Sequence, residues 1–168
     1  MEFCLDTSVY IQAYRTYYAF DIAPRFWQAL EELAASGIII SPIAVHVEII
    51  KSKDNLASWV KKQNNSLFIE PDEQVNSYLS QIADFTNENY LDDHWIRHFL
   101  SGADPWVVAQ AKAQGLTVVT MEANKTSEEI DKSTKRIIGK IKIPNICNHF
   151  EVKCISTFDL LRILKIGL

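Results

Sequence analysis

A short apolar strand that ends in an acidic, hydroxyl-rich turn is the feature that most constrains this fold. The apolar run ends at Leu5, Asp-Thr-Ser follows, and a second apolar run then begins. This pattern predicts a buried strand over about residues 2–5 and a helix starting at Thr7 or Ser8. In parallel α/β sheets, ligands bind at the carboxyl ends of the strands, which is where Asp6 would lie. Asp6 is therefore a candidate site residue, although a helix cap or an Asx turn explains it equally well.

Short apolar strands and helical segments alternate along the rest of the chain. The further strands are expected at 38–40, 67–69 and 116–120, with extended pieces at 143–147 and 152–155. The helices are expected at 24–36, 41–51, 54–63, 72–87, 92–100 and 104–114, with a last one from 157. This alternation predicts an α/β sandwich with a largely parallel sheet. The length of 168 residues fits a single domain over residues 1–168.

Composition excludes several protein classes. Hydrophobic residues make up 48% of the chain, yet no apolar run approaches the roughly 20 residues that a membrane-spanning helix needs. The first residues carry acids and no basic leader, so we expect no signal peptide. Three cysteines form a sparse, odd set, which is typical of reduced thiols in a cytoplasmic protein.

Three further acids stand beside apolar or helix-starting segments. Glu48 lies in the run Ile-Ala-Val-His-Val-Glu-Ile-Ile, where a helix buried on most sides would make an unpaired carboxylate costly. Asp104 precedes a proline at a helix start, which is an ordinary capping pattern that also directs a carboxylate outward. Glu122 follows the strand that ends at Thr120, and Thr120 is placed to orient a neighbouring carboxylate or a water. Solvent-exposed loop or helix positions would explain Glu48 and Glu122 without any function.

These four acids together indicate a site for a divalent cation. Two of them come just after strand ends and two lie on helices expected to pack nearby. Without a cation, such a cluster would repel itself and raise its own pKa values. Oxygen ligands with no adjacent Cys or His favour Mg²⁺ or Mn²⁺.

A basic segment and several aromatic residues are candidates for substrate contacts. The net charge is −4, but residues 125–142 hold six basic and three acidic residues. This segment would attract a phosphodiester backbone, although a solvated surface explains it as well. Its candidate substrate-binding residues are Lys125, Lys135, Arg136 and Lys140. Tyr14, Tyr17, Tyr18 and Trp106 are candidates for stacking on RNA bases, with core packing or a dimer contact as the alternative.

The order of these motifs resembles the PIN-domain family, which comprises metal-dependent ribonucleases and includes the VapC-type toxins of prokaryotic toxin–antitoxin systems. The resemblance is carried by Leu5-Asp6-Thr7-Ser8, by Glu48 in a helix after Ser41-Pro42, by Ala103-Asp104, and by Val118-Val119-Thr120 with an acid two residues on. It spans nearly the whole chain. The aromatic stretch 14–27 and the segment 142–147 resemble one uncharacterised prokaryotic branch of PIN-like proteins.

The resemblance implies a three-layer α/β/α sandwich with the acids at the carboxyl ends of its central strands. It implies that Asp6, Glu48 and Asp104 are the core acids and Glu122 the fourth, in a position where relatives usually carry Asp. Thr120, with Thr7 or Ser8, would supply hydroxyls that orient the acids. The implied activity is cleavage of RNA phosphodiester bonds with Mg²⁺ or Mn²⁺, as the toxin of a type II pair. The implied partners are RNA, an antitoxin and a second copy of the chain, with stretch 14–27 expected at one of the protein contacts.

Other interpretations remain open from the sequence. A PIN-like module that binds RNA or protein without cutting is favoured by the altered fourth acid and opposed by the other three. A zinc site would use Cys147, His149 and Cys154 with Cys4, but their spacing lacks the usual pattern. A phosphatase that uses Asp6 as acceptor would typically need a second Asp two residues on, where this chain has Ser8.

Overall fold

Five parallel strands form the centre of the molecule. The structure is a computed structural model that describes residues 2–63, 66–123 and 128–166. The strands of the sheet are β1 (Phe3–Leu5), β2 (Ile39–Pro42), β3 (Phe68–Ile69), β4 (Thr117–Val119) and β7 (Cys154–Ile155). Their order is β3-β2-β1-β4-β7, and every neighbouring pair is parallel. The carboxyl ends of β1 and β4, the two strands that precede the predicted acids, therefore lie side by side.

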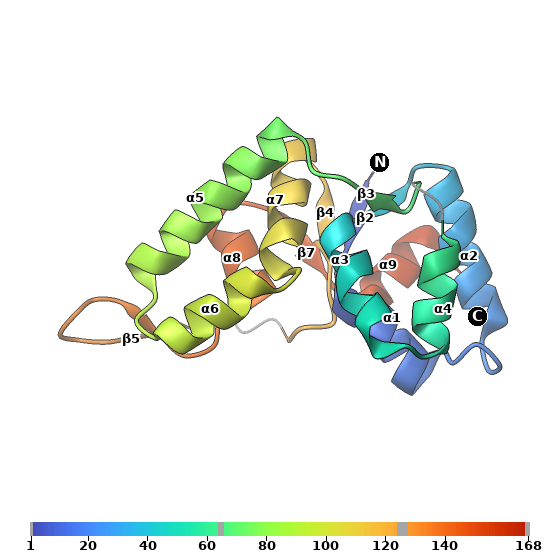
Figure 1. Ribbon diagram of the computed structural model, residues 1–168, viewed down its shortest axis with the longest axis horizontal. Helices are drawn as coiled ribbons and strands as arrows, with labels where there is room; N and C mark the ends of the chain where they lie inside the picture. Colours follow the sequence, from blue (N-terminus) through green and yellow to red (C-terminus); the bar gives the residue numbers. More distant parts are fainter. Residues whose placement is uncertain (1, 64–65, 124–127, 167–168) are drawn as a thin grey trace.

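Helices cover both faces of this sheet. Figure 1 shows α5, α6, α7 and α8 on one side and α1, α2, α4 and α9 on the other. The helices are α1 (Thr7–Gln12), α2 (Pro24–Ala35), α3 (Ile43–Ile49), α4 (Asn55–Lys62), α5 (Glu73–Asn89), α6 (Asp93–Ser101), α7 (Asp104–Gln114), α8 (Ile143–His149) and α9 (Thr157–Leu164). A π-helical turn, η1 (Ala13–Tyr17), extends α1, and a 3₁₀ turn, η2 (Ile50–Ser52), extends α3. The predicted three-layer α/β/α sandwich with a parallel sheet is confirmed.

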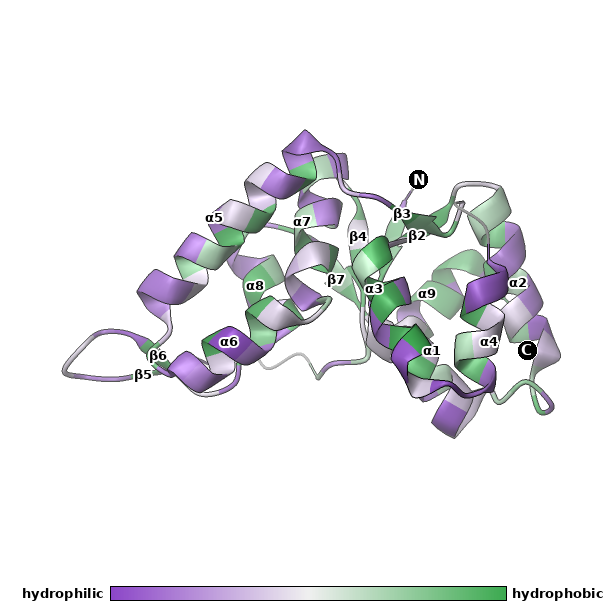
Figure 2. Ribbon diagram, in the orientation of Figure 1, coloured by the Kyte–Doolittle hydropathy of each residue, from purple (hydrophilic) through white to green (hydrophobic). Residues whose placement is uncertain are grey.

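The core follows the apolar periodicity of the sequence. All three residues of β1 are buried, and α2 buries Phe26, Trp27, Leu30 and Ala34 along one stripe. Figure 2 shows β3 as strongly hydrophobic, whereas hydrophilic and hydrophobic residues alternate along α5. Helix α5 packs on α7 and buries Val75, Ile82 and Thr86. Within the described part of the chain, no helix is both long and apolar enough to cross a membrane.

The structure corrects two predicted elements. The helix expected from residue 41 begins at Ile43, with Pro42 in its cap position. Ser41 and Pro42 themselves end β2, because the Ser41 amide donates to the Leu67 carbonyl (2.7 Å) and the residue is fully buried. Segment 143–147 is not extended but lies in α8, where Ile143, Ile146 and Cys147 share the buried face. A short apolar run does not distinguish a buried strand from a buried helix, so the sequence could not settle the second case.

The predicted polar and basic segment also contains structure. Strands β5 (Glu129–Ile130) and β6 (Ile137–Ile138) pair as an antiparallel hairpin. The Leu91 amide donates to the Ile137 carbonyl (2.8 Å), so this hairpin is attached between α5 and α6. Figure 1 shows it projecting at the end of the molecule away from the central sheet.

The aromatic stretch 14–27 was expected to offer a protein contact, but most of its rings pack inward. Phe20 packs on Trp27 with ring centres 4.4 Å apart, and Tyr18 stacks on Phe26 at 4.7 Å. Only Tyr17 and Ile22 belong to the exposed large hydrophobic residues among those described in this stretch. Tyr17 and Ile22 are therefore the large apolar side chains of this stretch that are open to the predicted contact, which stays a prediction.

Candidate active site

The register of β1 against β4 places Asp6 beside the loop that carries Glu122. Leu5 pairs with Val119, and the Asp6 amide donates to the Val119 carbonyl over 3.0 Å. Thr120 and Glu122 follow Val119 directly, so the parallel pairing brings them to the edge of the sheet where Asp6 lies. This juxtaposition is the one that the strand endings predicted.

Asp6 both caps α1 and faces the site. Its Oδ2 atom accepts hydrogen bonds from the Ser8 amide (3.2 Å), the Ser8 hydroxyl (2.5 Å) and the Thr120 hydroxyl (2.9 Å). No described residue donates to Oδ1, so one oxygen is held and the other is free for a ligand. Burial raises the pKa of Asp6, the Ser8 and Thr120 bonds oppose this, and the charge of Glu122 adds to it.

Glu48 reaches the same edge from α3. Its Oε2 atom accepts a 2.6 Å hydrogen bond from the hydroxyl of Thr7, the residue next to Asp6. The expectation that this helix is buried on most sides is wrong. Val45 and Ile49 are buried, whereas Val47 is 48% exposed. Glu48 is half-buried at the margin of the apolar face, so its carboxylate is open to solvent on one side.

Asp104 is the first residue of α7 and not its cap, because Ala103 holds the cap position without a side-chain hydrogen bond. Burial is the main reason that the pKa of Asp104 rises from 3.8 to about 8. Three other charges raise this pKa further, those of Asp6, Glu122 and Glu48 in decreasing order, whereas Lys140 lowers it. All four predicted acids therefore lie close enough to interact electrostatically.

Glu122 has a structural partner of its own. Its Oε2 atom accepts a 2.8 Å hydrogen bond from the amide of Ile143, the first residue of α8. Its own amide donates to the Thr120 hydroxyl over 3.1 Å, so Thr120 bridges Glu122 and Asp6. Glu122 thus holds the start of α8 as well as facing the acids, a role that its sequence position did not reveal.

The donor set fits a hard divalent cation by its chemistry. The oxygens come from carboxylates, and their mutual repulsion would be relieved by a bound positive charge. Among the described residues, however, no group of three or more His, Cys, Asp or Glu side chains is arranged to hold a metal ion. Mg²⁺ commonly keeps several waters and uses one or two carboxylates, so a site at Asp6 and Asp104 does not require a closed cage.

The predicted basic residues are not gathered at the acids. Lys140 is exposed and close enough to Asp104 to affect its pKa. Lys135 lies in the turn of the β5–β6 hairpin, and Arg136 donates through Nη2 to the Asn87 carbonyl over 2.5 Å at the end of α5. The fourth predicted residue, Lys125, lies outside the described residues.

A cavity of about 390 Å³ adjoins the acids, and its lining includes Glu48 and Trp106 together with Lys51 and Glu70. Sequence reasoning named Trp106 as a stacking candidate but missed Lys51 and Glu70. The signal that would have found Lys51 is its place one turn after Val47 and three residues after Glu48. Glu70 shows no such signal, because it reaches the cavity only through the pairing of β3 with β2.

Comparison with known proteins gives a family and a fold. The family model described as a domain of unknown function, DUF4411, matches residues 3–168. No curated protein matches the chain. A chain of the crystal structure of VapBC2 from Rickettsia felis, bound to a DNA fragment from their promoter, is similar with a TM-score of 0.51 at 16% identity. The match covers 93% of this chain and 98% of that chain, and at this identity it bears on the fold alone.

Proposed function

The chain belongs to the DUF4411 family, and we propose that it is a metal-dependent endoribonuclease with a PIN-like active site. The observation that carries the proposal is the meeting of Asp6, Glu48, Asp104 and Glu122 beyond the carboxyl ends of adjacent parallel strands. Burial, and after it the charges of the other three acids, raise the pKa of Asp104 to about 8, as expected for an acid that a bound cation would neutralise. The similarity to a VapBC2 chain supports a PIN-like arrangement of the fold that carries them.

In this proposal Asp6 and Asp104 hold a Mg²⁺ or Mn²⁺ ion, with Glu48 and Glu122 contributing through water. When bound, such an ion makes a water molecule nucleophilic near neutral pH and offsets charge on a phosphate. Thr120 and Ser8 fix one oxygen of Asp6, so that its other oxygen keeps a constant direction.

The other described residues of the site orient the acids and attract the substrate. The Thr7 hydroxyl holds Glu48 in the same way that Thr120 holds Asp6. Lys140, exposed beside Asp104, attracts the phosphodiester backbone, and Lys135 on the hairpin does so at longer range. Arg136 is committed to the Asn87 carbonyl and contributes mainly by holding the hairpin.

We further propose that the protein is the cytoplasmic toxin of a type II toxin–antitoxin pair and that it forms a homodimer. The similarity to a chain of VapBC2 supports an antitoxin as partner. An antitoxin would inhibit by covering the acids, since any group that blocks Asp6 and Asp104 prevents both ion and RNA from binding.

A second candidate is a module that binds RNA or protein without cutting it. Two observations favour it: one oxygen of Glu122 is already used by the Ile143 amide, and the described acids form no group of three arranged around a metal. The candidates differ in metal affinity, because a nuclease must bind its ion and a binding module need not.

The test is cleavage of a labelled RNA pool by the purified protein with Mg²⁺ or Mn²⁺, beside an EDTA control and Asp104→Asn. Asp93→Asn is the matched control, because Asp93 is also the first residue of a helix but is exposed. Discrete cleavage by the wild type and by Asp93→Asn, lost in EDTA and in Asp104→Asn, is expected. No cleavage, together with no Mn²⁺ binding in a calorimetric titration, would exclude the nuclease and leave the binding module.

A further inference from the structure

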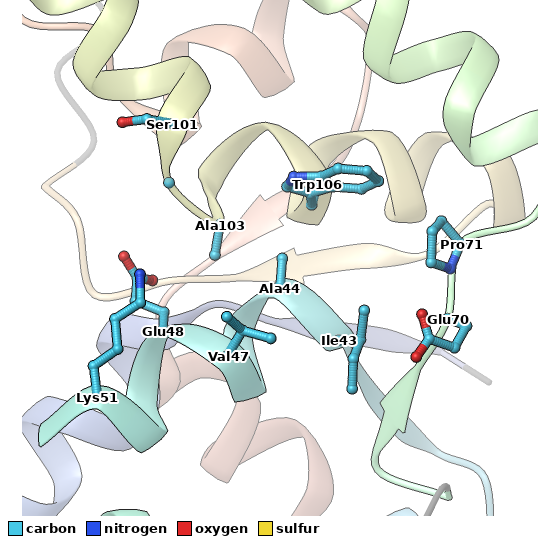
Figure 3. Close-up of a pocket in the computed structure, with 11 residues that line it drawn as sticks. Ile43, Ala44, Val47, Glu48, Lys51, Glu70, Pro71, Ser101, Ala103 and Trp106 are labelled. Carbon is cyan, nitrogen blue, oxygen red and sulfur yellow. The ribbon is translucent and has the colours of Figure 1, made fainter. Parts of the chain in front are cut away.

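The cavity beside the acids lies between an aromatic side chain and several aliphatic ones, and we call it the slot. Figure 3 shows the indole of Trp106 facing Ile43, Ala44 and Val47 across the opening. An aromatic plane thus forms one wall and aliphatic side chains form the other. Trp106 is half-buried and Val47 is exposed, so both walls are accessible to a ligand.

The two ends of this slot carry different charges. Figure 3 places Glu48 and Lys51 at one end and Glu70 with Pro71 at the other. Because Glu48 also belongs to the acidic site, the first end is continuous with that site. Glu70 is exposed, and no described residue donates a hydrogen bond to its carboxylate, so its acceptor oxygens are free.

The volume of about 390 Å³ is within the range of small-molecule sites. One nucleotide of a single strand fits the slot best, because RNA-binding proteins stack splayed bases on aromatic side chains and read their edges through hydrogen bonds. Lys51, at the same end of the slot as Glu48, provides a positive charge for a phosphate.

The chemistry of Glu70 selects among the bases. An ionised carboxylate only accepts hydrogen bonds. Guanine alone presents two adjacent N–H donors on its Watson–Crick edge. Adenine and cytosine place an acceptor nitrogen beside their amino group, and uracil flanks its single N–H with carbonyls.

We propose that this slot binds a guanine base of the RNA strand next to the phosphate that meets the acids, with Trp106 stacking on the ring and Glu70 accepting from its edge. The inference rests on the proposed ribonuclease function and adds a base preference to it. It makes Trp106 and Glu70 substrate-binding residues and places Lys51 near the backbone of the same nucleotide.

Binding of fluorescein-labelled pentanucleotides in EDTA, followed by anisotropy, tests the inference without cleavage. The probes are UUGUU, UUAUU and UUUUU. UUGUU should bind the wild type at least fivefold more tightly than the other two. Trp106→Leu should weaken UUGUU binding roughly tenfold, as expected for loss of one base–aromatic stack. Trp95→Leu, which removes a half-buried tryptophan that does not line the slot, should leave binding unchanged.

Glu70→Gln is the second variant, and because Glu70 is exposed it should fold normally. It should remove the preference for UUGUU and leave UUUUU binding unchanged. Equal binding of the three probes by the wild type, or an unaltered preference in Glu70→Gln, overturns the inference. Unaltered UUGUU binding in Trp106→Leu also overturns it and leaves the slot to a side chain of a protein partner.

Cleavage of an RNA pool with Mn²⁺, mapped on the same preparations, separates this inference from the proposed function. Cuts next to guanine that lose this preference in Glu70→Gln support both. Cuts without base preference overturn the guanine slot and keep the nuclease, whereas guanine-selective binding without any cleavage contradicts the nuclease.

Discussion

Asp104→Asn should stabilise the metal-free protein although it removes a residue of the proposed active site. The pKa of Asp104 is raised from 3.8 to about 8, first by burial and then by the neighbouring acids. Since one pKa unit corresponds to about 1.4 kcal/mol, the ionised carboxylate destabilises the folded state by at most roughly 6 kcal/mol. Solvent access and side-chain relaxation reduce this value, so we expect a gain of about 1–3 kcal/mol in the free energy of unfolding at pH 8.

The sign of this effect depends on pH. The folded chain keeps the Asp104 proton up to about pH 8, whereas the unfolded chain releases it near 3.8. The wild type therefore loses stability as the pH rises between these two values, and the neutral Asn does not. The advantage of Asp104→Asn should be small at pH 5 and should grow steadily to pH 8.

Urea unfolding in EDTA at pH 5, 6, 7 and 8 measures the difference between wild type and variant at each pH. Asp93→Asn is the control, because it loses the same favourable charge at a helix N-terminus from an exposed position. It should be neutral or slightly destabilising at every pH. An Asp104→Asn protein no more stable than wild type at pH 8, or a pH-independent difference, would refute the argument from buried, clustered charge.

Metal should reverse the order of stability. A ligand present at about one hundred times its dissociation constant stabilises the folded state by about 2.7 kcal/mol. Mn²⁺ should therefore raise the melting temperature of the wild type and leave that of Asp104→Asn almost unchanged. Addition of EDTA should return the wild type to its metal-free melting temperature. An equal rise in both proteins would mean that Mn²⁺ binds elsewhere.

Three further substitutions test the supporting contacts. Thr120→Val should lower the free energy of unfolding by about 1–2 kcal/mol and reduce cleavage, because a buried oxygen of Asp6 loses a donor. Thr120→Ser, which keeps the hydroxyl, is the control. Equal urea midpoints for Thr120→Val and the wild type would contradict this prediction. Glu122→Gln should keep or slightly raise the melting temperature in EDTA, because the amide oxygen still accepts from Ile143 and one charge is removed from the acids. It should weaken Mn²⁺ binding in calorimetry, and unchanged affinity would exclude Glu122 from the site. Burial acts to raise the pKa of Glu128, but hydrogen bonds from three neighbouring side chains outweigh burial and lower this pKa. The ionised Glu128 therefore stabilises the folded state above pH 4.5, and this contribution is lost on acidification. Glu128→Gln should flatten that loss in acid urea titrations, and an unchanged pH profile would argue against it.

Much of the fold was readable from the sequence because its signals are local. The apolar run before Asp6 and the helices expected over 24–36, 54–63 and 72–87 depend on signals within a few residues, and α2, α4 and α5 lie in those ranges or within two residues of them. The order of strands and helices then allowed only a parallel sheet, which places the ends of β1 and β4 together. Asp6 and Thr120 could be assigned to one site on that basis.

Contacts between distant segments were decided only by the tertiary structure. Pairing with β3 kept Ser41 in a strand, although its sequence is that of a helix start. The packing of α8 lets the Ile143 amide donate a hydrogen bond to Glu122, and no spacing in the sequence predicts this bond. The attachment of the β5–β6 hairpin at Leu91 directs Arg136 to the Asn87 carbonyl at the end of α5, which no local pattern predicts.

The sequence by itself thus determined which residue types stand at the ends of the strands, and so the chemistry offered at that edge of the sheet. The tertiary structure decided how those residues are used: which oxygen of Asp6 is free, why the pKa of Asp104 is raised, and that Glu70 lies at the end of the cavity that Trp106 lines. The physical reason is that periodicity and capping act over a few residues, whereas burial, charge interaction and cavity shape are sums over segments that meet only in the folded chain.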